Sequence, residues 1–148
     1  MLETVFRTGM LMNRLIPAYF AALAAFCVLD GIWLWATRDY YQSQIGSLLR
    51  AEPKLAAAAG FYLVYLAGLV VLAVMPALER NSSRRCAGLS ALLGVCAYGT
   101  YGLTNYALLN NWPLGMTVLD IAWGATLSML AGLAGYWLAK SLSLRNRS

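Results

Sequence analysis

The sequence predicts an all-α membrane protein with four transmembrane helices. Of its 148 residues, 61% are hydrophobic and only 11% are charged, whereas a soluble domain carries about 25% charged residues. Four apolar stretches are long enough to cross a hydrocarbon core of about 30 Å, which takes about 20 helical residues. They cover residues 15–36, 55–78, 87–109 and 114–139. The chain therefore forms one membrane domain, with no room for a separate soluble module.

The first stretch resembles a signal peptide at its start, because Arg7 and Arg14 precede an alanine-rich run. The apolar run continues through Trp35, which is longer than the 7 to 15 residues of an apolar signal region, so we expect an uncleaved span. We expect residues 1–13 to form a flexible tail. Three methionines could start the chain: Met1, Met10 and Met12.

The first loop, residues 38–54, is the longest connection between the predicted spans. Tyr41, Ile45 and Leu49 recur at helical spacing and give one apolar face, opposite Gln42 and Gln44. The pattern predicts a short amphipathic helix on the membrane surface. This helix either only connects two spans or forms a lid over a site between them.

The third and fourth stretches are joined by residues 110–113, the tight polar turn Asn-Asn-Trp-Pro. Its Trp suits the membrane interface and its Pro suits the start of a helix. Because the turn is so short, the two helices must be antiparallel neighbours.

The distribution of Lys and Arg predicts how the chain is oriented. Eight of the eleven lie in the N-terminal tail, the second loop and the C-terminal tail, whereas Arg38, Arg50 and Lys54 share the first loop. The positive-inside rule therefore places both termini in the cytoplasm. The net charge of +5 follows from this topology, and we expect no nucleic-acid partner.

Several kinds of chemistry are excluded by composition. The chain has no histidine, which removes imidazole bases and histidine-bound metals. Cys27, Cys86 and Cys96 lie at spacings that make no CxxC motif, and we expect buried free thiols. Neither a metal site nor a cofactor is predicted, and no nucleophile elbow or phosphate loop is found.

Two carboxylates, Asp30 and Asp120, fall within the predicted spans. A charge at the centre of a transmembrane helix costs about 2.5 to 3.5 kcal/mol, so such residues face the bundle interior or a wet cavity. Each lies six residues from the outer end of its span, about 9 Å deep at 1.5 Å per residue. Both occur in the string Val-Leu-Asp-x-x-Trp, which ends at Trp33 and Trp123.

Further polar and aromatic residues share this level of the membrane, and together they predict a polar cavity above an apolar floor. The candidate ligand-binding residues are Asp30, Trp33, Tyr62, Tyr65, Tyr98, Tyr101, Asn105, Asp120 and Trp123. If the polar stripe of the third helix faces the fourth helix across the turn, Tyr101 and Asn105 can donate hydrogen bonds to Asp120. On the fourth helix Gly124, Ser128 and Gly132 form a small-residue stripe for close helix packing, against either the third helix or another chain.

Three functions remain open at this point. The leading hypothesis is a protein that binds or presents a small amphipathic or lipid-like ligand, since such sites combine aromatic walls with a few polar groups. The second is a structural subunit of a homo-oligomer or membrane complex, in which the same polar groups only hold helices together for about 0.6 to 2 kcal/mol per contact. The third, which we favour least, is a lipid-modifying enzyme that uses Asp and Tyr as acid and base.

The combination of motifs also resembles a known family. The segments that carry the resemblance are Asp-Gly-Ile-Trp at 30–33, Phe-Tyr-Leu-Val-Tyr at 61–65, Tyr-Gly-Thr-Tyr-Gly-Leu-Thr-Asn at 98–105, Trp-Pro at 112–113 and Asp-Ile-Ala-Trp-Gly at 120–124. They are similar to a family of small bacterial inner-membrane proteins filed as domain of unknown function 2177. The resemblance implies four spans and brings no activity. It also implies that an acid is common at the position of Gly102, where this chain has none.

Overall fold

The computed structural model describes the backbone of residues 2–145 and the side chains of residues 13–145. Over this range the chain is helical, with short connections and no strand. The elements, in order, are α1 (Leu2–Ile45), the 3-10 helix η1 (Gly46–Leu48), α2 (Leu55–Leu69), the π-helix η2 (Val70–Val74), α3 (Met75–Glu79), α4 (Ser83–Leu108) and α5 (Leu114–Arg145).

Four helical segments are long and apolar enough to span a membrane, which confirms the predicted number. Their bounds are Asn13–Leu48, Leu55–Glu79, Ser83–Leu108 and Leu114–Arg145. The second of these segments is one rod built from α2, η2 and α3.

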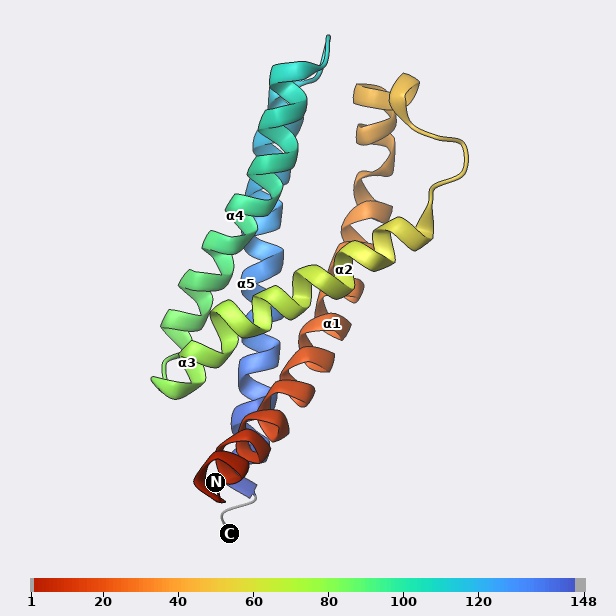
Figure 1. Cartoon of the computed structure of the whole chain (residues 1–148). Coiled ribbons are helices and arrows are strands. Elements are labelled where there is room, and N and C mark those ends of the chain that lie inside the picture. Colours follow the sequence, from red (N-terminus) through yellow and green to blue (C-terminus); the bar gives the residue numbers. More distant parts are fainter. Residues whose placement is uncertain (1, 146–148) are drawn as a thin grey trace.

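The helix α5 lies at the centre of the arrangement and packs against α1 and α4. Figure 1 shows α4 and α5 as a tall antiparallel pair, with the rod of α2, η2 and α3 crossing obliquely. The α4/α5 turn and the C-terminal part of α1 lie at the end of the molecule away from the last turns of α5; we call this the distal end. Because α2 begins well below that turn in Figure 1, it lies beside the middle of the bundle.

The first loop differs from the sequence prediction. Residues 38–45 do not form a separate surface helix; they extend α1, and only the single turn of η1 follows. The reason is local, because no Gly or Pro interrupts the chain between Ala36 and Gly46. The extension carries Tyr41 and Ile45 over the interior of the distal end, where Ile45 packs with Trp112 and Met116.

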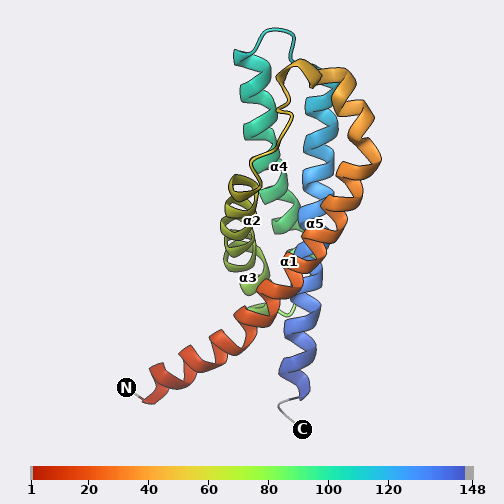
Figure 2. The same ribbon diagram turned by 90° about the vertical axis from the view of Figure 1, so that its right-hand side faces the viewer.

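The N-terminal end of α1 also covers the segment predicted as a tail, since the helix begins at Leu2. In Figure 2 its first turns lean away from the other helices. Pro17 lies inside this helix, where it cannot donate a backbone hydrogen bond, and a bend is the usual result.

The π-helical turn η2 has a similar local cause. Pro76 follows it closely in α3, and a proline leaves the carbonyl four residues earlier, that of Leu72, without its helical partner. A single π-helical turn accommodates the missing hydrogen bond, and the helical rod continues through it. The turn also places Val70, Ala73 and Val74 in the buried core.

Small residues set the contact between α4 and α5. A Cβ atom added to Gly94 would overlap the carbonyl of Gly124, and one added to Gly132 would overlap Ser90. At Gly102 an added Cβ would lie 2.8 Å from Thr117 Cγ2. The stripe of Gly124, Ser128 and Gly132 therefore faces α4 of the same chain.

Candidate functional site

A cavity of about 580 Å³ lies at the distal end, between α1, α2, α4 and α5. Its polar and aromatic walls are formed by Asp30, Trp33, Arg38, Tyr41, Gln42, Arg50, Tyr62, Tyr98, Tyr101, Asp120 and Trp123. Apolar side chains complete it: Leu34, Ile45, Leu49, Pro53 and Met116. Residues from every long helix thus converge on one hollow that contains both intramembrane acids.

Asp30 joins three helices at this cavity. It is only 6% exposed, and it accepts a hydrogen bond from the hydroxyl of Tyr62 on α2. Its other oxygen accepts from Nε1 of Trp123 on α5 at 3.1 Å. A phenol and an indole satisfy the buried carboxylate without adding a positive charge.

Asp120 is held in a similar way from α1. It is 7% exposed and accepts from the hydroxyl of Tyr41. That hydroxyl in turn accepts from Nε1 of Trp33 at 3.2 Å. The donors to both carboxylates are therefore neutral, and any ionised carboxylate here keeps its full negative charge.

The two tryptophans that end the Val-Leu-Asp-x-x-Trp strings stack on each other. The rings of Trp33 and Trp123 lie 4.3 Å apart between centroids and are tilted by only 7°. The helices α1 and α5 are antiparallel, so each indole reaches across: Trp123 binds Asp30 directly, and Trp33 reaches Asp120 through Tyr41. This exchange explains why the same spacing of Asp and Trp occurs in both helices.

A second, apolar hollow adjoins the cavity through two shared side chains. Its volume is about 290 Å³, and it is lined by Phe61, Ala97, Tyr98 and Tyr101. Tyr98 and Tyr101 also line the larger cavity. Phe61 is 49% exposed on α2, on the outside of the bundle. The polar cavity and the apolar hollow thus share Tyr98 and Tyr101 as lining residues, and the apolar hollow lies on a surface that would face lipid.

The structure brings most of the predicted site residues together and leaves two aside. Tyr65 lies deeper, where its hydroxyl and that of Ser128 are 2.7 Å apart. Asn105 does not line the cavity. Its predicted hydrogen bond to Asp120 is wrong, because the packing of Gly102 against Thr117 places Asn105 nearer the α4/α5 turn than the acid.

Tyr101 does line the cavity, but its predicted hydrogen bond to Asp120 is also wrong. Its ring packs edge-on against Trp112 at 5.8 Å. The recorded donor to Asp120 is Tyr41, which sequence reasoning placed on a separate loop helix.

The residues that the sequence analysis missed come from the end of α1 and the segment after it. They are Leu34, Arg38, Tyr41, Gln42, Ile45, Leu49, Arg50 and Pro53, with Met116 on α5. A signal was present for Tyr41, because Asp30, Trp33 and Tyr41 lie three, then eight residues apart on one face of a continuous helix.

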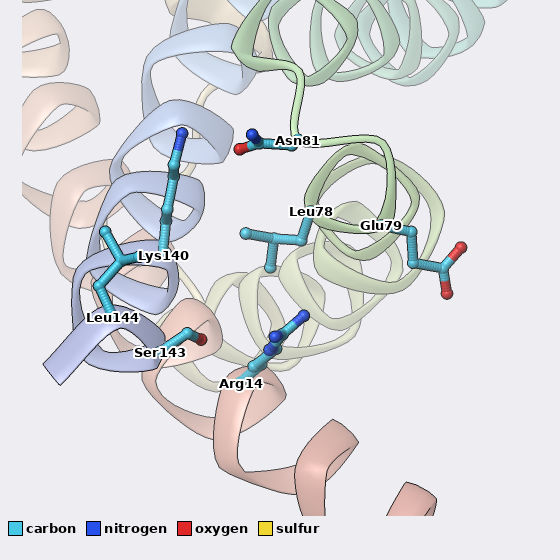
Figure 3. Close-up of a pocket in the computed structure, with 7 residues that line it drawn as sticks. All are labelled: Arg14, Leu78, Glu79, Asn81, Lys140, Ser143 and Leu144. Carbon is cyan, nitrogen blue, oxygen red and sulfur yellow. The ribbon is translucent and has the colours of Figure 1, made fainter. Parts of the chain in front are cut away.

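A separate hollow of about 390 Å³ lies at the opposite end of the bundle. Its lining residues are Arg14, Leu78, Glu79, Asn81, Lys140, Ser143 and Leu144 (Figure 3). Lys140 lies over the rings of Tyr136 and Trp137, with its Nζ 5.6 and 5.2 Å from their centroids. Figure 3 shows the Glu79 carboxylate pointing away from Lys140. This hollow contains no tryptophan or tyrosine in its lining, in contrast to the distal cavity.

The described side chains offer no other obvious chemistry. Over residues 13–145 there is no group of three or more Cys, Asp and Glu residues that could hold a metal ion. The three cysteines are free; Cys86 is buried, whereas Cys27 and Cys96 are exposed on the helices, contrary to the expectation that all are buried.

Comparison with known proteins identifies a family. A family model described as "Predicted membrane protein (DUF2177)" matches residues 15–137. No curated protein matches the chain, and no solved structure matches it.

Proposed function

Since the chain belongs to the DUF2177 family of predicted membrane proteins, we propose that its distal cavity binds an amphipathic, lipid-like molecule from the surrounding bilayer. One observation carries the proposal. The polar cavity around Asp30 and Asp120 adjoins an apolar hollow, and Tyr98 and Tyr101 belong to both. A polar head would occupy the first, and an apolar chain would leave through the second.

The cost of the polar cavity supports a binding role. The contact of Gly94 with Gly124 packs α4 against α5 without either carboxylate. The two acids instead connect α1 with α2 and α5, and both also line the cavity. Intramembrane acids are expensive and mark functional sites. Ligand sites also combine aromatic walls with a few polar groups, and this cavity does so.

The alternative function, a structural subunit of an oligomer or membrane complex, is supported by fewer observations than the sequence offered. The small-residue stripe that could bind a partner chain is occupied by α4, so an oligomer would have to use a different face. Exposed apolar side chains such as Phe20, Trp35 and Val64 are expected wherever a helix faces lipid.

An enzymatic role is the second candidate function. The hydroxyls of Tyr41 and Tyr62 donate to the two carboxylates, and such pairs can transfer protons. Accumulation of a modified lipid in expressing cells, lost with Asp120→Asn, would favour this role over binding alone.

Native mass spectrometry tests the binding proposal. The protein is released from lipid nanodiscs, and the natural chain is compared with the Asp30→Asn, Asp120→Asn double variant. Asn removes the charge and keeps one acceptor oxygen, which can face Tyr41 at position 120 and Trp123 at position 30. At position 30 the amide NH2 replaces the second oxygen and can donate to the Tyr62 hydroxyl, which donates to Asp30 in the natural chain. We expect a defined lipid adduct on the natural chain and at least a tenfold lower adduct fraction on the variant.

A charge-matched control removes two exposed acids outside the cavity lining, with Asp39→Asn and Glu52→Gln. Its adduct should match that of the natural chain. Equal adducts on all three proteins, each with a helical circular dichroism spectrum, would contradict the proposal.

We further propose a multi-pass protein of the bacterial plasma membrane with both termini in the cytoplasm, from the distribution of Lys and Arg. In a background without native cysteines, Ser47→Cys at the distal end should react with an impermeant maleimide added to spheroplasts. Ser141→Cys, near the end of α5, should react only after lysis. Both serines are exposed. The reverse pattern would show the opposite orientation.

A further inference from the structure

We propose that the head group bound in the distal cavity is zwitterionic, with a cationic amine beside the two carboxylates and a phosphate-type anion beside Arg38 and Arg50. This inference rests on the proposed function and names the chemical class of its ligand. It comes from the cavity lining, which contains two acids, two arginines and a set of aromatic side chains.

The acids form the cationic subsite. Their donors are phenol and indole groups, so no side chain recorded at either carboxylate neutralises it. A carboxylate has about four lone-pair sites, and the recorded hydrogen bonds leave several of them free. An ammonium group would supply the missing charge, and aromatic side chains such as Tyr62 and Tyr98, which line the cavity, are of the type that attracts cations.

The arginines form the anionic subsite. Arg38 precedes Tyr41 by three residues on α1, so the two side chains are neighbours on one helix face, and Tyr41 is the donor to Asp120. Arg50 reaches the same cavity from the segment between η1 and α2. Both arginines are exposed and also line the cavity, and a guanidinium binds phosphate through paired hydrogen bonds.

Other head groups fit less well. A purely anionic head would meet two buried carboxylates, and a purely cationic head would meet the two arginines. A neutral head would leave the carboxylates with neutral donors only, in a site of low polarity. The arrangement of two acids and two arginines in one cavity therefore favours a zwitterionic head group. It also disfavours amphiphiles that carry a single charge.

The test uses three soluble probes that carry the same two six-carbon acyl chains: dihexanoyl phosphocholine, dihexanoyl phosphoglycerol and dihexanoyl trimethylammonium propane. The full chain is held in a non-ionic maltoside detergent, and binding is followed by calorimetry. We expect dihexanoyl phosphocholine to bind about tenfold tighter than either single-charge probe.

Two double variants assign the subsites. Arg38→Gln with Arg50→Gln should weaken phosphocholine binding about tenfold and leave the ammonium probe unchanged or tighter. The matched control, Lys54→Gln with Arg80→Gln, removes the same charge outside the cavity and should leave the order of the three probes as in the natural chain.

The outcomes separate the two proposals. If all three probes bind equally well, or the anionic probe binds tightest, the zwitterionic inference is overturned while amphiphile binding stands. If none of them binds and the native adduct is absent as well, the proposed function fails. Loss of binding in the arginine variant for every probe alike would overturn the assignment of the subsites.

Discussion

Replacement of Gly94 by alanine is expected to destabilise the protein by about 3 kcal/mol. The added Cβ would overlap the backbone carbonyl of Gly124 and approach Ser128 Oγ. Backbone on α5 cannot rotate away as a flexible side chain would, so α4 and α5 must separate along their whole contact. Overpacking of a tight interface costs about 1 to 3 kcal/mol, and backbone overlap belongs at the upper end.

The measurement is the fraction unfolded by SDS in mixed micelles, followed by circular dichroism. Gly88→Ala is the matched control on the same helix, because a Cβ there meets nothing within 4 Å. It should leave the stability unchanged or raise it by up to about 1 kcal/mol through helix propensity. Equal unfolding of both variants would show that the contact of Gly94 with Gly124 does not hold α4 against α5.

The number of helices follows from the sequence for two reasons. A span must satisfy its backbone hydrogen bonds within the helix, and it must be apolar over about 20 residues to cross the membrane. Composition does not determine where a helix ends when no Gly or Pro interrupts it. The sequence of residues 38–45 is equally compatible with a separate surface helix and with an extension of α1. Tertiary contacts decide the matter, since Ile45 packs with Trp112 and Met116.

The site was predictable in its acids and tryptophans, because their cost in the membrane makes them conspicuous. Which donor meets Asp120 was not predictable, because it depends on the axial register of α4 against α5 and on how far α1 continues. The register follows from close contacts such as Gly102 with Thr117. From sequence alone, Arg38 and Arg50 indicate only the orientation of the chain, because a Lys or Arg near the end of a span is typical of membrane topology.

Gly102, the position at which the resemblance implies an acid, has a packing role in this structure. Gly102 lets Thr117 approach, and Thr117 Oγ1 accepts a hydrogen bond from Trp112 Nε1 at 3.0 Å. A side chain at position 102 would displace this contact. The cavity lining therefore contains two acids, Asp30 and Asp120, while Gly102 serves the close packing of α4 against α5.

Replacement of Trp123 by alanine is expected to cost about 2 kcal/mol of stability and to remove the lipid adduct. The indole both stacks on Trp33 and donates to Asp30. An aromatic pair contributes about 0.5 to 1.5 kcal/mol, and an interhelical hydrogen bond in a membrane about 0.6 to 1.7 kcal/mol. The loss of both leaves Asp30 with the single donor Tyr62 and opens the wall between the two acids.

The same SDS titration measures this cost, and native mass spectrometry measures the adduct. Trp35→Ala is the control, because Trp35 is 82% exposed and its loss should change neither the stability nor the adduct.

The two measurements also distinguish a structural from a binding role for the acids and indoles. A large loss of stability with the adduct retained would mean that the acids and indoles act as helix glue, whereas loss of the adduct at modest cost in stability is what a binding site requires. Trp123→Phe keeps a ring for stacking but not the donor, so its adduct should fall between those of the natural chain and Trp123→Ala.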